Sequence, residues 1–199
     1  MASRIVVGIS GWQYAPWRGV FYPKGLPQRL ELAFASRALP SIEINGSFYS
    51  LQRPSSYARW DRETPPGFVF SVKGGRYITH LLRLKEPEQA VARFFGSGLL
   101  NLGPKLGPVL WQFPPNFTFD EELFRKFLDL LPPDTGRAAD LARRHAALQP
   151  GGEPRGRRRI RYAVEIRNDS FRDPAFVQAT TTAVARLMTM AAMLRIKTA

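Results

Sequence analysis

Polar side chains that could carry out acid/base or binding chemistry stand near the ends of four short apolar segments. They are Glu43, Asn45, Lys73, Gln112, Glu165 and Arg167. Two carboxyl groups can transfer protons when burial keeps one protonated and a neighbouring cation keeps the other ionised. We therefore expect Glu43 and Glu165 to form a catalytic acid/base pair, with Arg167 or Lys73 as the neighbouring cation.

Lys73 and His80 are two further candidates for catalysis. An uncharged lysine in an apolar site could form a Schiff base, whereas a charged one binds and orients anions. Glu43, on a neighbouring segment, stabilises the ammonium and favours the second role. His80, in the loop "GGRYITH", is a candidate second base.

A second group of side chains is expected to bind and orient the substrate: Asn45, Tyr49, Gln112, Arg167 and Trp12. Trp12 belongs to an aromatic-rich loop that either packs on its neighbours or forms a wall for a ring-shaped ligand. The loop's Pro16 and Pro23 favour packing. The two acids and two bases could also simply neutralise one another in a structural network.

Metal and cofactor chemistry is not expected. The chain has no cysteine and two histidines, His80 and His145, neither of which has paired-ligand spacing. His80 with Glu43 and Glu165 could supply three ligands, but a single loop histidine is more often a hydrogen-bonding group or base.

The elements that must position these residues alternate along the chain. Five segments rich in Val, Ile or aromatic residues are predicted as strands: 5–10, 41–45, 68–73, 108–113 and 162–167. Segments with helical periodicity follow them: 26–39, 53–64, 86–103, 118–133 and 174–194. Thr118 and Glu121 have the spacing of a capping box. This alternation predicts parallel strands joined by crossover helices.

Each predicted strand has a bulky apolar face and a smaller or polar face, as Ile42 and Ile44 alternate with Glu43 and Asn45. An open doubly wound sheet would be apolar on both faces, so the pattern favours a TIM-barrel-like (β/α) barrel. A half-exposed antiparallel sheet also alternates, but the intervening helices disfavour it. Barrel dimensions place the carboxyl groups of Glu43 and Glu165 roughly 6 Å apart, which suits opposite sides of a sugar-like substrate.

Five motifs resemble, in order and spacing, the domain of unknown function 72 (YecE-like) family. They are "GWQYAPWRGVFYP", "IEINGSFY", "FVFSVKGGRYITH", "LGPVLWQFPPNF" and "AVEIRNDSF". The resemblance runs from about Gly8 to Phe176 and implies a TIM-barrel-like fold, in agreement with the alternation. It implies no particular reaction.

The chain departs from the family pattern in two places. The family's Arg-His-x-x-Trp segment is matched by Arg167 to Phe171 without its histidine and tryptophan, and a later Tyr-x-Arg-x-His-Gly strand has no counterpart. A complete barrel takes about 250 residues. We therefore expect one domain over residues 1–199, an incomplete barrel of about five strands, and a divergent or truncated tail from about residue 178.

The formal net charge of +13 raises the question of nucleic-acid binding. Much of it lies in residues 137–160, which are rich in Arg, Pro and Gly and are predicted to form a flexible insertion loop. Arg-rich loops are more often solvated surface, so nucleic acid is the less favoured partner. No apolar segment is long enough to span a membrane and the N-terminus does not resemble a secretory signal, so a cytoplasmic location is expected.

The sequence therefore predicts a small-molecule enzyme of the hydrolase or lyase type, with a polar, sugar-like or anionic substrate bound at the barrel mouth. A non-catalytic, nucleic-acid-associated protein and an inactive, truncated family member are the alternatives.

Overall fold

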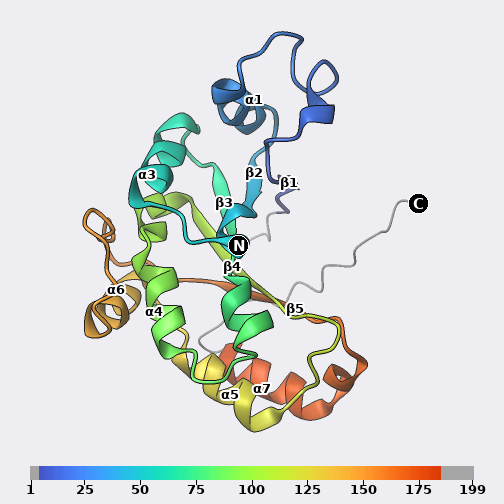
Figure 1. The fold of residues 1–199 in the computed structure, drawn as a ribbon, viewed down its shortest axis with the longest axis vertical. Helices are drawn as coiled ribbons and strands as arrows, with labels where there is room; N and C mark the ends of the chain where they lie inside the picture. Colours follow the sequence, from blue (N-terminus) through green and yellow to red (C-terminus); the bar gives the residue numbers. More distant parts are fainter. Residues whose placement is uncertain (1–4, 185–199) are drawn as a thin grey trace.

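The computed structural model describes residues 5–184, with the backbone alone for residues 181–184. Five parallel strands form one sheet in the order β1-β2-β3-β4-β5 (Figure 1). Their bounds are β1 Gly8–Ser10, β2 Ser41–Ile44, β3 Val69–Lys73, β4 Leu106–Gln112 and β5 Tyr162–Glu165. The prediction of an α/β fold with five parallel strands is confirmed.

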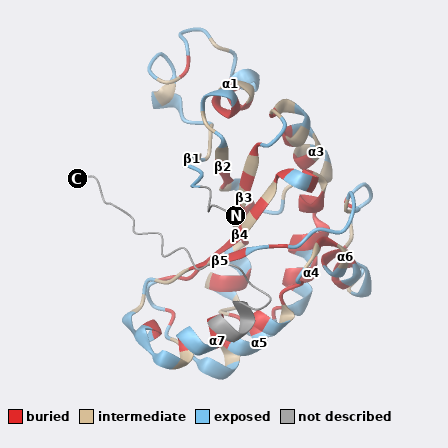
Figure 2. Ribbon diagram, turned by 180° about the vertical axis from the view of Figure 1, so that it is seen from behind, coloured by how far each residue is buried: buried red, intermediate tan, exposed pale blue. Residues whose placement is uncertain are grey.

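Helices connect successive strands, as parallel pairing requires. Their bounds are α1 Glu31–Ala38, α2 Gly46–Tyr49, α3 Pro54–Glu63, α4 Glu88–Gly96, α5 Glu121–Leu130, α6 Thr135–Arg144 and α7 Pro174–Val184. Short 3-10 helices span Ala15–Trp17, Gln28–Leu30, Leu99–Lys105 and Asp169–Arg172, and one π-helix spans Tyr77–Leu81. In Figures 1 and 2, α3, α4 and α6 lie along one side of the sheet, and α5 and α7 lie together at one end of the molecule.

The predicted alternation of faces is visible in the burial of the strands. Ile42 and Ile44 of β2, and Val109 and Trp111 of β4, are at most 1% exposed, as are Phe70 and Val72 of β3. Burying a side chain of this size contributes about 1.5–3 kcal/mol, so this face anchors the helices to the sheet. The opposite face carries partly exposed residues such as Ser71, Lys73 and Glu165. Figure 2 shows the buried residues concentrated between the sheet and the helices.

The sheet of the described residues has two edges, β1 and β5. Edge strands leave backbone groups without a partner, and Ile5 and Val7, next to β1, are 89% and 66% exposed. The described part of the chain is therefore an open sheet, and closure into a barrel stays a prediction.

Several predicted local features are wrong. The helix expected over residues 86–103 divides at Gly98, whose φ of 106° ends α4 and starts a 3-10 helix. The cap of α5 is Asp120, whose carboxylate accepts a hydrogen bond from Leu123 N at 2.9 Å, and not Thr118.

The segment predicted as a flexible loop over residues 137–160 begins with helix α6, because Asp134 caps this helix by accepting from Arg137 N. The first part of the helix predicted over 174–194 is present as α7, which is described as far as Val184; residues 185–194 lie outside the described residues.

Candidate functional site

The predicted site residues lie at or just beyond the carboxyl ends of the strands. Since all the strands are parallel, these ends share one edge of the sheet. The register pairs Glu43 of β2 with Ser10 of β1 and Ser71 of β3, whereas Glu165 of β5 pairs with Gln112 of β4. The two glutamates therefore have different neighbours in the sheet. The short distance expected between their carboxyl groups stays a prediction.

The first group is a hydrogen-bonded chain of Ser10, Glu43 and Asn45. The Ser10 hydroxyl donates to Glu43 Oε1 at 2.8 Å, and Asn45 Nδ2 donates to Ser10 Oγ at 2.7 Å. Glu43 is 9% exposed, and its other oxygen, Oε2, is buried without a hydrogen-bond partner among residues 5–184. A buried carboxylate oxygen that is left unpaired costs free energy, and such atoms mark sites of strain or function. Ser10 was not among the predicted site residues, although it falls on the same strand face in the alternation.

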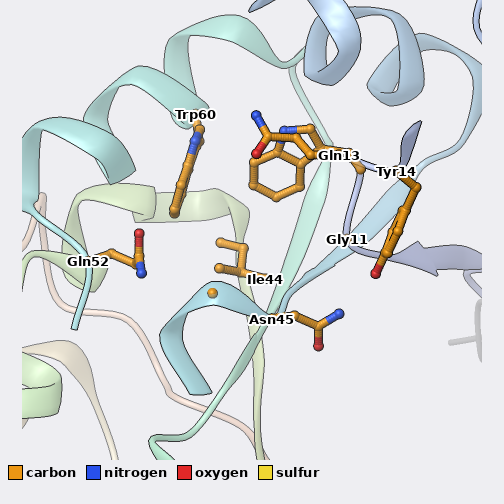
Figure 3. Close-up of a pocket in the computed structure, with 9 residues that line it drawn as sticks. Gly11, Gln13, Tyr14, Ile44, Asn45, Gln52 and Trp60 are labelled. Atoms are coloured by element: carbon orange, nitrogen blue, oxygen red, sulfur yellow. The ribbon is translucent and has the colours of Figure 1, made fainter. Parts of the chain in front are cut away.

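A pocket of about 240 Å³ opens beside this group (Figure 3). Its lining comes from the loop after β1, from the end of β2 and the start of α2, from the segment between α2 and α3, and from α3: Gly11, Trp12, Gln13, Tyr14, Ile44, Asn45, Gly46, Gln52 and Trp60. The rings of Trp12 and Trp60 meet edge to face, with their centroids 5.3 Å apart. The pocket thus combines aromatic walls with amide groups, a composition typical of small-molecule sites.

The aromatic loop after β1 divides between the two roles considered for it. Trp17 and Phe21 pack against each other with ring centroids 5.7 Å apart, and Tyr22 is 1% exposed. Trp12 and Tyr14 line the pocket, and the Tyr14 hydroxyl donates to Ser10 O at 2.6 Å. Trp60 was missed, because the periodicity of 53–64 indicates only a helix and not which neighbour its tryptophan meets. Gln52, just before that segment, was missed because no pattern in the sequence marks it.

The second group is the set of Lys73, Arg76, His80 and Arg167, which we call the cationic cluster. The first three contact the rings of Phe48 and Tyr49, and Arg167 is paired with Glu165. Lys73 Nζ lies 5.2 Å from the centroid of Phe48, and the His80 ring meets the same phenyl ring edge to face at 5.1 Å. Arg76 lies over the ring of Tyr49 at 5.9 Å. Cation–π contacts hold such charges in place without neutralising them.

His80 is affected by burial and by the surrounding positive charges. Burial, followed by the positive charges of Arg167, Arg76 and Lys73, lowers the pKa of the His80 imidazole below its ordinary value. Thr79 Oγ1 lies 2.9 Å from His80 Nδ1, which fixes the orientation of the ring. Arg167 is 87 residues from His80 in the chain, so this proximity is a product of the fold. A lowered pKa leaves the imidazole neutral near pH 7, as a general base requires.

If the two acids and two bases formed only a structural network, all four would neutralise one another. They do not. Glu165 holds Arg167 through a bond of 2.7 Å between Oε1 and Nε. Glu43 instead accepts from Ser10, and Lys73 lies over Phe48 with no ion pair to any residue in 5–184. Glu165 and Arg167 therefore form an ion pair, whereas Glu43 and Lys73 remain available to other partners.

Residues 5–184 contain no group of three or more His, Asp or Glu side chains that could hold a metal ion. His145 lies apart from His80, with its Nδ1 3.2 Å from Gln89 Oε1. The helices of this part of the chain include none that is long and apolar enough to cross a membrane.

The Arg-rich segment is tied to the body of the protein. Arg155 Nη2 bonds Asp61 Oδ2 on α3 at 2.6 Å, and Arg157 Nη2 bonds Asp134 Oδ2 at 2.8 Å. These arginines thus have carboxylate partners within the chain. Nucleic-acid binding by this segment stays a prediction.

Comparisons with known proteins find a family model and several relatives that match this chain. The family model described as "Protein of unknown function DUF72" matches residues 6–194, which extends past Phe176. The chain is 32% identical over 123 residues to UPF0759 protein YunF of Bacillus subtilis, covering 59% of this chain and 43% of that protein. It is 27% identical over 150 residues to UPF0759 protein YecE of Escherichia coli, covering 75% of this chain and 52% of that protein. The chain spans about half the length of these relatives.

Two crystal structures of a DUF72 family protein from Enterococcus faecalis share the fold. One has a TM-score of 0.60 at 18% identity and covers 91% of this chain and 57% of its own. The other has a TM-score of 0.54 at 20% identity and covers 78% and 55%.

Proposed function

Because the chain belongs to the DUF72 family of proteins of unknown function, which matches residues 6–194, we propose that it carries part of a (β/α)-barrel enzyme site for a small polar substrate. The five strands would form one side of a TIM-barrel-like fold, with the substrate at their carboxyl ends. The substrate is sugar-like or anionic, and the reaction is a hydrolysis or elimination under acid/base catalysis.

One observation carries the proposal: the buried, unpaired Oε2 of Glu43. The Ser10 hydroxyl occupies Oε1 and leaves Oε2 without a hydrogen bond. This oxygen can accept one more hydrogen bond. A substrate hydroxyl or a transferred proton would satisfy the second oxygen.

The neighbouring residues suit distinct roles in this chemistry. Glu43 is the proton-transferring carboxyl, and Glu165, which already holds Arg167 as its counterion, is the second, charged carboxylate. Asn45 and Gln112 orient the substrate, and Trp12 supplies an aromatic wall for its ring. His80 is a second base.

A panel of chromogenic aryl glycosides and their phosphorylated counterparts tests the proposal. The protein should cleave at least one of them, and Glu43→Gln should reduce turnover by about 100-fold or more. Glutamine keeps the acceptor for Ser10, so circular dichroism and thermal unfolding should stay unchanged. Glu121→Gln, on the exposed surface of α5, is the matched control and should keep full activity. Full turnover by Glu43→Gln, or no turnover of any panel member by the wild-type protein, would contradict the proposal.

A further inference from the structure

The cationic cluster contains more positive charge than its acidic neighbour neutralises. Lys73, Arg76 and Arg167 contribute three positive charges, and Glu165 is the one carboxylate that forms an ion pair with any of them among residues 5–184. Three less one leaves a formal charge of +2. Lys73 and Arg76 have aromatic rings and no carboxylates as their described contacts. This excess charge, on side chains that solvent reaches, can attract an anion.

The geometry holds these charges in place before any ligand arrives. The Phe48 ring contacts both Lys73 and His80, and it also meets the Tyr49 ring at 5.1 Å. Tyr49 in turn lies beneath Arg76. The two aromatic residues lie in the short helix α2, whose Ser47 hydroxyl donates to Lys73 O at 2.6 Å. The two rings therefore hold Lys73, Arg76 and His80 in one connected unit, and Glu165 holds Arg167, which lowers the cost of ordering these side chains on binding.

Two neutral groups complete the surroundings of the cluster. Gln112 is 6% exposed and is paired in register with Glu165, and its side-chain NH2 group is a hydrogen-bond donor. When the Thr79 hydroxyl donates to His80 Nδ1, the ring carries its proton on Nε2 and can donate to an anion. The site thus offers an ammonium, two guanidinium groups, an imidazole and an amide.

We propose that Lys73, Arg76, His80 and Arg167 bind the phosphate group of a small phosphorylated molecule. A phosphate monoester near pH 7 carries close to two negative charges, which matches the excess of +2, whereas a carboxylate carries one. Guanidinium groups bind phosphate oxygens through paired hydrogen bonds, and lysine contributes a point charge. This inference rests on the proposed function for the position of the site and narrows its substrate to phosphorylated compounds.

Imidazole NMR signals provide the test, because His80 and His145 are the chain's two histidines. Inorganic phosphate, compared with chloride at equal ionic strength, should raise the pKa of His80 by about 1 or more, since it adds opposite charge beside the ring. His145, bonded to Gln89 away from the cluster, is the internal reference and should not move. Acetate at the same concentration should have a much smaller effect.

Variants identify the residues responsible. Lys73→Met should weaken phosphate binding at least tenfold, measured by the shift of the His80 signal during a phosphate titration. Lys126→Met, which removes an exposed lysine of α5, is the matched control and should leave the affinity unchanged.

Three results would overturn the proposal: a His80 signal insensitive to phosphate, equal shifts of His80 and His145, or an equal effect of acetate. This readout needs no turnover. If the protein binds phosphate but cleaves no glycoside, the proposed reaction alone is refuted. If it cleaves a glycoside but does not bind phosphate, the phosphate site alone is refuted.

Discussion

Replacing Gly74 with alanine should destabilise the protein, and the structure explains why in atomic terms. Gly74 directly follows Lys73, and its N–H donates to Leu110 O at 2.8 Å. A Cβ added there would lie 2.2 Å from Cε3 and 2.3 Å from Cζ3 of the Trp111 ring. Real carbon atoms do not approach so closely, so the tryptophan or the strand must move.

Trp111 has little room to move. It is fully buried, and its ring meets those of Phe94 at 5.4 Å and Phe127 at 5.2 Å. Overpacking a dense core typically costs 1–3 kcal/mol, and a contact this short with a rigid ring favours the upper part of that range. We therefore expect Gly74→Ala to lower the free energy of unfolding by about 2–3 kcal/mol.

Urea unfolding followed by circular dichroism measures this change through the midpoint at constant slope. Gly75→Ala is a matched control one residue along, because the nearest atom to its added Cβ is Ser47 O at 3.8 Å. It should change stability by less than about 1 kcal/mol. A Trp111→Phe background should relieve part of the Gly74→Ala penalty. Equal stabilities of the two alanine variants would refute the packing of Gly74 against Trp111.

Two further predictions concern the cap of α5 and the titration of His80. Asp120→Ala should lower the free energy of unfolding by about 1 kcal/mol, because it removes the acceptor for Leu123 N, whereas Thr118→Ala should have little effect. A larger loss for Thr118→Ala in thermal unfolding would show that Thr118, and not Asp120, caps the helix. Because the pKa of His80 is lowered in the folded protein, its contribution to stability is present above the unfolded value of about 6.5 and is lost as the pH falls. His80→Gln should therefore flatten the decline of the urea midpoint between about pH 7 and pH 5, and an unchanged slope would contradict this assignment.

Local patterns in the chain were enough to predict the sheet and the edge that carries the polar groups. Alternating Ile42, Glu43 and Ile44 specify which face of β2 is buried, since a strand turns successive side chains to opposite faces. The same rule applied to β3, β4 and β5 and placed Lys73, Gln112 and Glu165 at one edge. This information is local, so a single sequence contains it.

Tertiary structure alone decided which polar groups meet. Glu43 was expected to face Lys73, but its carboxylate accepts from Ser10, 33 residues away, and Lys73 lies instead over Phe48. The Arg-rich segment was expected to be flexible, yet Arg155 reaches Asp61 across 94 residues. Such pairings depend on strand register and on how each crossover packs. Those features arise from the summed burial of many distant side chains, so no short motif encodes them.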